Sequence, residues 1–178
     1  EITTRLVGSE MCIRDRNVFK EYYGNPELTR QSKFRYQGKE YFKTGTNGRL
    51  LLDGSFELTG RSSRFYIIST LNKVYCDHVQ MALNTIEGIE SAAVVKHPDS
   101  KWLYVGHAFI ILNDKTMTSE RIIKELKKER KTFNGEVIQL KEYEIPKYFT
   151  VVEKFPRTKA DKIDYMELEK ESLSIYGE

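Results

Sequence analysis

The 178-residue sequence has few of the residues that mark specialised architectures. Two cysteines, four prolines and eleven glycines exclude a disulfide framework, a collagen repeat and a glycine-rich or proline-rich chain. An excess of one charge is also lacking, because 29 lysines and arginines against 26 aspartates and glutamates leave a net charge of +3. Since the two signs are interleaved, the sequence predicts no basic face for nucleic acid or for a membrane surface.

Long apolar runs are absent as well, since none approaches the roughly 20 residues that cross a bilayer. The first residues also lack the pattern of a secretory signal. We therefore expect a soluble, cytoplasmic protein without a membrane span. Cys12 and Cys76 lie in unrelated sequence settings, which favours free thiols. The three histidines, His78, His97 and His107, are not spaced as ligands on one element, so we expect structural or surface histidines and no metal site.

Residues 1–16 differ from the rest of the chain, because they show neither helical nor alternating periodicity. The run from Glu10 to Arg16 looks like translated linker or adapter sequence. We therefore treat 1–16 as a non-native or disordered segment, excluded from fold prediction, and expect the natural protein to continue further upstream.

The sequence of residues 17–60 predicts short strands and tight turns. A turn before Pro26 precedes a short helix that starts near this proline. The pairs Asn47-Gly48 and Asp53-Gly54 are hairpin signals, which predicts strands at 49–52 and 55–59. The small polar cluster from Gly60 to Ser63 then predicts a boundary, with a second domain over 61–178.

The residues after this boundary mix strands with helices. Strands are predicted at 65–68, 73–75, 92–95, 103–112 and 148–152. Helices are predicted from a cap at Asp77 to Gly88, between 118 and 131, and at 165–173. This order predicts an α+β fold, in which a small mixed sheet has flanking helices.

Common self-contained active sites are absent, because the sequence has no phosphate loop, no G-x-G-x-x-G and no H-E-x-x-H. The polar loop at 155–162 is the candidate segment for a chemical role. It carries Arg157, Lys159 and Lys162, and Pro156 stiffens its entry. A lysine ammonium with three donors suits a phosphate. Composition alone leaves a solvated basic turn as the alternative.

Five segments, in order, resemble the carboxy-terminal third of the adenylate-forming enzymes. They are Tyr22–Thr29, Tyr41–Gly45, Asp53–Arg61, Ile145–Phe149 and Phe155–Tyr165. The resemblance spans nearly everything from Val18 to Glu169. This superfamily includes acyl-CoA synthetases, the amino-acid-activating domains of peptide synthetases and D-alanine–carrier protein ligases.

The resemblance implies that 61–178 form the small C-terminal lid and that 17–60 are terminal strands and turns of a large adenylation domain. It further implies a ligase that uses ATP with Mg²⁺ to form an acyl-adenylate from a carboxylic or amino acid. The acyl group would pass to the thiol of coenzyme A or of phosphopantetheine on a carrier protein. The phosphate loop and acyl pocket would lie in the missing N-terminal domain, so we expect the isolated chain to be inactive.

Residue by residue, the resemblance implies a catalytic role for Lys162, which would reach the α-phosphate and the carboxylate. Arg61 and Thr46 fall on nucleotide-binding positions and Ser63 on the hinge. Each neighbourhood departs from the family pattern: Asp161 replaces a glycine before the lysine, Thr46 replaces the aspartate that holds the ribose, and Ser63 replaces an Asp or Lys.

A further departure is the run from Tyr66 to Lys73, which contains no glycine although the family has one along the pantetheine path. These departures favour a second hypothesis, in which a degenerate, non-catalytic lid serves as a binding module for a carrier protein or partner ligase. A small nucleic-acid-binding domain is disfavoured, because the sequence lacks an aromatic and basic patch of the RNA-binding type.

Overall fold

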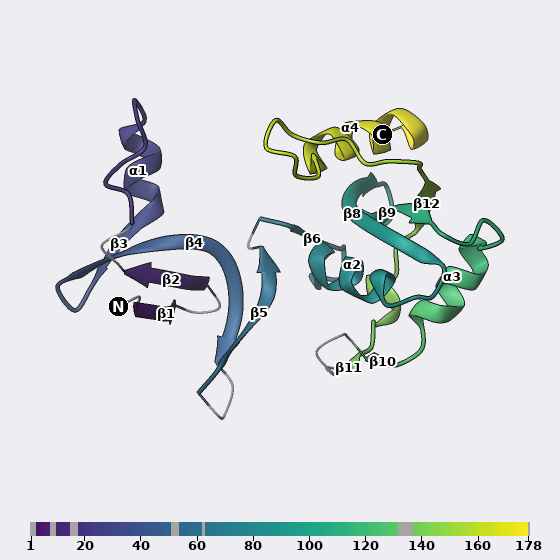
Figure 1. Ribbon diagram of the computed structural model, residues 1–178, viewed down its shortest axis with the longest axis horizontal. Coiled ribbons are helices and arrows are strands. Elements are labelled where there is room, and N and C mark those ends of the chain that lie inside the picture. The colour runs from purple at the N-terminus through teal and green to yellow at the C-terminus, as the bar shows by residue number, and fades with distance from the viewer. Residues whose placement is uncertain are drawn as a thin grey trace. The chain divides into compact units, whose positions relative to one another are not determined.

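The computed structural model describes residues 3–7, 10–14, 18–50, 54–61, 63–131 and 137–177. The chain divides into two compact units, Glu1–Ser63 and Arg64–Glu178 (Figure 1). Among the described residues, no helix has the length and apolar character needed to span a membrane.

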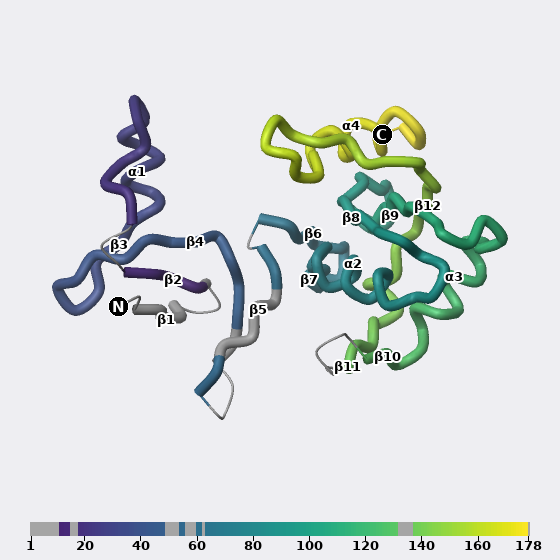
Figure 2. Tube along the Cα trace, in the orientation of Figure 1, coloured from purple at the N-terminus to yellow at the C-terminus, as the bar shows by residue number. Residues whose placement is uncertain are grey.

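The first unit is an antiparallel sheet with one short helix. Its strands are β1 (Thr3–Val7), β2 (Glu10–Arg14), β3 (Lys33–Tyr36), β4 (Lys39–Leu50) and β5 (Phe56–Arg61), and its helix is α1 (Pro26–Ser32). The long strand β4 pairs with β2, β3 and β5, and Figure 2 traces it through the unit. The predicted helix at Pro26 is confirmed, because Asn25 accepts a hydrogen bond from the amide of Leu28 at 2.9 Å and Pro26 opens the first turn.

Two features of this unit differ from the sequence-based expectation. The sequence predicts no regular structure in residues 1–16, whereas β1 and β2 lie there and β2 pairs along β4. The predicted turn at Asn47-Gly48 is wrong, because β4 continues to Leu50 and carries a bulge at this point. Asn-Gly suits a bulge as well as a turn, and pairing with β5 selects the bulge. The chain reverses between Leu50 and Phe56, and Asp53 of the other predicted turn lies outside the described residues.

The second unit is the α+β domain that the sequence predicts. Its main sheet has the order β12-β9-β8, with β8 and β9 antiparallel and β12 parallel to β9. The strands of this sheet are β8 (Ile89–Asp99), β9 (Leu103–Leu112) and β12 (Tyr148–Val151). Two hairpins are β6 (Phe65–Ile67) with β7 (Lys73–Tyr75), and β10 (Arg130–Lys131) with β11 (Val137–Ile138). The helices are α2 (Cys76–Asn84), α3 (Ser119–Leu126), the 3₁₀ turn η1 (Glu142–Glu144) and α4 (Tyr165–Tyr176).

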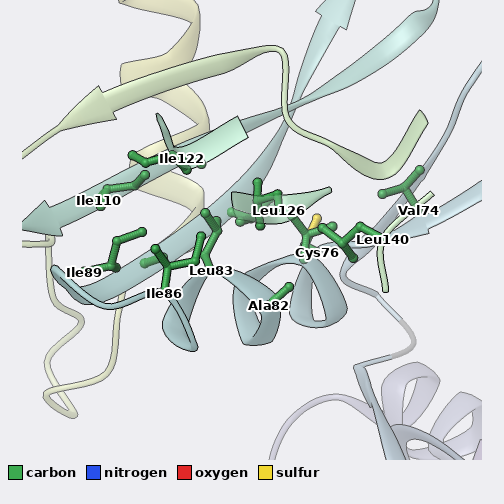
Figure 3. Close-up of a cluster of buried hydrophobic side chains, with 14 of the residues drawn as sticks. Val74, Cys76, Ala82, Leu83, Ile86, Ile89, Ile110, Ile122, Leu126 and Leu140 are labelled. Atoms are coloured by element: carbon green, nitrogen blue, oxygen red, sulfur yellow. The ribbon is translucent and has the colours of Figure 1, made fainter. Parts of the chain in front are cut away.

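Two apolar clusters lie on opposite faces of this sheet, because neighbouring residues of a strand point to opposite sides. The larger cluster packs α2 and α3 on one face, and Figure 3 shows Leu83, Ile110 and Leu126 within it. The smaller cluster packs α4 and the loop before it on the other face. Its buried members are Ala93, Val95, Phe109, Phe155 and Leu168. The apolar face predicted for α2 is confirmed for Val79, Ala82 and Leu83, which are buried, whereas Ile86 is buried just beyond the end of the helix.

The observed ends of α2 and α3 differ from the predicted ones. Asp77 does not cap α2, which begins at Cys76, because its carboxylate pairs with Arg64 instead. The helix stops at Asn84, and Gly88, with φ +93°, leads into β8. The helix α3 ends at Leu126, where its apolar stripe ends, and the following charged residues turn away into β10.

Candidate active site

The loop that carries the predicted catalytic lysine lies between β12 and α4 and is closed at its neck. Phe155 begins the loop and is buried in the smaller apolar cluster. The amide of Asp164 donates to the carbonyl of Pro156 at 2.8 Å, and Arg157 pairs with Ile163 in an antiparallel bridge. The amide of Thr158 donates to the carbonyl of Lys162 at 2.8 Å. Residues 158–162 are therefore the tip of a bonded hairpin.

The backbone of Lys162 is held, whereas its side chain is exposed. Its amide donates to the hydroxyl of Thr158 at 3.3 Å. Within the described part of the chain, the ammonium has no recorded hydrogen bond or ion pair. A fixed Cα with a free cationic head suits contact with an anion that another body of protein presents.

Asp161, the residue before this lysine, has φ +58°. This left-handed conformation favours glycine, and aspartate is one of the few other residues that adopts it readily. Arg157 donates to the carbonyl of Asp161 at 2.8 Å, and its guanidinium lies 3.4 Å from the carboxylate. The negative charge of Asp161 is therefore directed at Arg157, although both groups are exposed and the pair is weak.

Thr46 and Arg61 lie together in the first unit, because they are direct partners on β4 and β5. The guanidinium of Arg61 donates to the carbonyl of Thr44 at 2.9 Å and lies 3.4 Å from the hydroxyl of Thr46. This places a cation and a hydroxyl side by side, as contact with an oxygen-rich group requires. Ser63 is exposed at the last position of the same unit, whereas Lys162 belongs to the second unit.

Arg64 is a site neighbour that sequence reasoning missed. Its guanidinium pairs with Asp77 and lies 3.4 Å from the centre of the Tyr165 ring. Tyr165 follows Lys162 by three positions and donates its hydroxyl proton to Gln80 at 3.2 Å. No spacing rule connects residues 64 and 165. The only signal in the sequence is an aromatic residue directly after the lysine motif.

The β6–β7 hairpin has Leu71 in its turn, with φ +62° and a side chain that is 85% exposed. Its amide donates to the carbonyl of Ile68 at 2.8 Å. A positive φ is costly for leucine and suits glycine. Leu71 is therefore a residue under backbone strain in a run where the family resemblance implies a glycine.

The two cysteines and two of the histidines are buried. Burial raises the pKa of the Cys76 thiol to about 12. His97 and His107 are buried, and each has its Nδ1 2.8 Å from the hydroxyl of Ser172. Among the described residues, no three His, Cys, Asp or Glu side chains form a group able to hold a metal ion.

Comparison with known proteins agrees with this architecture. Residues 78–162 match the model of the AMP-binding enzyme C-terminal domain. The 2-succinylbenzoate–CoA ligase of Listeria monocytogenes is 33% identical over 86% of this chain and 30% of that protein. The D-alanine–D-alanyl carrier protein ligase of Lactococcus lactis is 24% identical over 92% of this chain and 32% of that protein. The solved o-succinylbenzoate CoA synthetase of Bacillus subtilis, in complex with its acyl-adenylate, has a TM-score of 0.77 at 24% identity and covers 95% of this chain and 33% of that one.

The fold, the family match and these relatives define a class, the C-terminal region of adenylate-forming enzymes. Within this chain, residues 78–162 carry the C-terminal domain of the AMP-binding enzyme family. The chain spans a third or less of the length of the relatives that it matches.

Proposed function

We propose that this chain is the C-terminal part of an ATP-dependent acyl or aminoacyl ligase. The observation that carries the proposal is the exposed Lys162 at the tip of a bonded hairpin, at the end of the matched C-terminal domain. The solved relative in complex with an acyl-adenylate supports the same class of reaction. The first half-reaction would use ATP with Mg²⁺, held mainly by a large N-terminal domain.

In this reaction, a carboxylate oxygen of the substrate bonds to the α-phosphorus of ATP, and the bond to pyrophosphate breaks. Negative charge accumulates on the α-phosphate oxygens as the two events proceed. Lys162 would place its ammonium against these oxygens, where one donor typically lowers the barrier by about 2.7–4 kcal/mol. Loss of this donor should therefore slow adenylation by roughly two to three orders of magnitude.

Arg61 and Thr46 would contact the nucleotide through their side chains. The guanidinium suits the ribose and phosphate oxygens, whereas the threonine hydroxyl offers one oxygen in place of a carboxylate pair. We therefore expect weaker nucleotide binding than an aspartate would give. We also propose Ser63 as the hinge between residues 17–60 and the lid at 61–178, and the division into units between Ser63 and Arg64 supports this position.

A chimera tests the role of Lys162. This chain, joined to the large domain of the Listeria ligase, should support ATP–pyrophosphate exchange, and Lys162→Ala should reduce the rate by roughly 100-fold to 1000-fold. The matched control is Lys159→Ala, since Lys159 is exposed on the same tip and should be dispensable. Equal exchange by the parent chimera and Lys162→Ala would show that the lysine has no catalytic role.

The second candidate function is a degenerate lid that binds a carrier protein or partner ligase without catalysis. The strained Leu71 on an exposed hairpin favours it, because this hairpin corresponds to the pantetheine path in the family resemblance. The two candidates differ in the second half-reaction. A chimera that exchanges pyrophosphate and also transfers the acyl group to coenzyme A or to a carrier protein excludes the degenerate lid. A chimera that binds a carrier protein but does neither supports it.

A further inference from the structure

We propose that Arg64 is a positioning residue for Lys162, because it fastens the start of the second unit to the base of the Lys162 loop. This inference rests on the proposed ligase function for its catalytic consequence. The anchoring itself concerns only this chain, and it can be measured without any reaction.

Arg64 directly follows Ser63, the proposed hinge residue. Its side chain is 19% exposed and contacts three elements of the second unit. It pairs with Asp77 and lies 3.2 Å from the side-chain oxygen of Gln80, both on α2. It also donates to the carbonyl of Val94 on β8 at 3.0 Å. The fourth contact is the ring of Tyr165 on α4.

Tyr165 is held from two sides. The guanidinium of Arg64 lies over the Tyr165 ring, with its Cζ 3.4 Å from the ring centre. The Tyr165 hydroxyl donates to the side-chain oxygen of Gln80 at 3.2 Å. The ring also packs against the smaller apolar cluster, which contains Leu168. The ring quadrupole attracts a cation, and the attraction is stronger where water is partly excluded. The first residue of α4 is therefore fixed to α2 through Arg64 and Gln80.

Only Ile163 and Asp164 separate Tyr165 from Lys162, and both are themselves held. Asp164 caps α4 by accepting from the amide of Glu167 at 3.1 Å, while its own amide closes the neck of the loop. Ile163 packs against the same apolar cluster. A displacement of Tyr165 would therefore reach Lys162 through two residues that have little freedom to absorb it.

The several contacts of the Arg64 side chain require a guanidinium. A lysine would keep the ion pair with Asp77, but its point charge does not span Gln80, Val94 and the Tyr165 ring together. Misplacement of a catalytic group by about 1 Å can cost roughly 100-fold in rate. We therefore expect Arg64→Lys to leave the domain folded while it loosens the loop.

The first experiment measures amide hydrogen exchange in the 178-residue chain. Arg64→Lys and Tyr165→Leu should each speed exchange of the Lys162 and Asp164 amides by about 10-fold, with the amides of β8 and β9 unchanged. The control is Arg121→Lys, because Arg121 is an exposed arginine on α3 that lies 3.6 Å from Asp114. Exchange at Lys162 and Asp164 that is unaltered in both variants would overturn the proposal. If one variant fails to fold, the other decides.

The second experiment uses the chimera. Arg64→Lys should lower kcat for pyrophosphate exchange by roughly 10-fold to 100-fold, with KM for ATP within about threefold of the parent, because the loop is displaced and the nucleotide site is not. A larger KM at unchanged kcat would refute a positioning role. If the parent chimera is inactive, the ligase proposal fails, and the exchange measurement alone decides whether Arg64 anchors the loop.

Discussion

Mild acid should loosen helix α4, because two buried histidines of the sheet meet the buried hydroxyl of Ser172 on this helix. His97 and His107 lie 2.8 Å from the hydroxyl of Ser172, and the other ring nitrogen of His107 lies 2.9 Å from the hydroxyl of Thr150. Ser172 has one proton, so it can donate to one imidazole and accept from the other. A network with two protonated rings would leave the serine proton without an acceptor.

The size of the effect follows from His107. Burial lowers its pKa to about 4, and the nearby His97 acts in the same direction. An unfolded histidine titrates near 6.5, so the unfolded state binds more protons between the two values, and stability falls as the pH falls. A difference of about 2.5 units corresponds to about 3 kcal/mol, fully present above pH ~6.5 and lost by pH ~4.

His97 adds to this trend, because burial lowers its pKa as well. Asp99 opposes this shift and Lys147 reinforces it. The rings of Tyr148 and Tyr176 pack edge-on against both histidine rings, with centroids 5.1–6.1 Å apart. The two tyrosine rings stack on each other at 4.1 Å. Carboxylates with lowered pKa values, such as Asp99, lose their contribution only below their unfolded values near 4. Because unfolded glutamates titrate near 4.5, the range from pH 6.5 to about 5.5 reports mainly on the histidines.

The assay is urea unfolding of the chain at intervals across this range, followed by circular dichroism. The free energy of unfolding should fall with decreasing pH in the parent chain and fall less steeply in His107→Gln, which keeps only the contribution of His97. Ser172→Ala should cost about 1–3 kcal/mol at pH 7, since it leaves buried ring nitrogens without a partner. An equal pH slope in the parent and in His107→Gln would refute the reasoning.

Three further predictions concern single positions. Gly106→Ala should destabilise the chain by about 1–3 kcal/mol in urea unfolding, because a Cβ there would lie 2.8 Å from the Tyr66 hydroxyl and 3.2 Å from the Pro146 Cα; a neutral effect would contradict this packing. Leu71→Gly should raise the melting temperature, since relief of a positive φ exceeds the added flexibility of the unfolded chain by up to about 1 kcal/mol; a lower value would refute the strain at this turn. Cys76 should resist alkylation at pH 8 in the folded chain, because its raised pKa leaves about 1000-fold less thiolate than the free thiol has; labelling as fast as in urea would show that it is accessible.

Elements whose partners are close in sequence could be predicted. The apolar spacing of α2 fixes its buried face, and Asn25 with Pro26 fixes the start of α1. Elements whose form depends on distant pairing could not. Asn47-Gly48 reads as a turn until β5 pairs alongside it, and Asp77 reads as a cap until Arg64 competes for its carboxylate.

In the candidate site, too, some features could be predicted from the sequence and others could not. The place of Lys162 on an exposed loop follows from its motif, because proline, threonine and charged residues favour a surface turn. The closed neck of this loop depends on backbone pairing within residues 156–164, and the support of Tyr165 by Arg64 joins residues about 100 positions apart. Periodicity and spacing carry no information on such contacts.

The closed neck of the Lys162 loop also has an evolutionary consequence. Since the fold secures Phe155 and Asp164 below the tip, Lys159 and Ala160 contribute little to stability and are exposed. Mutations there can accumulate without moving the lysine backbone. The sequence of this tip can therefore change while the backbone of Lys162 keeps its position.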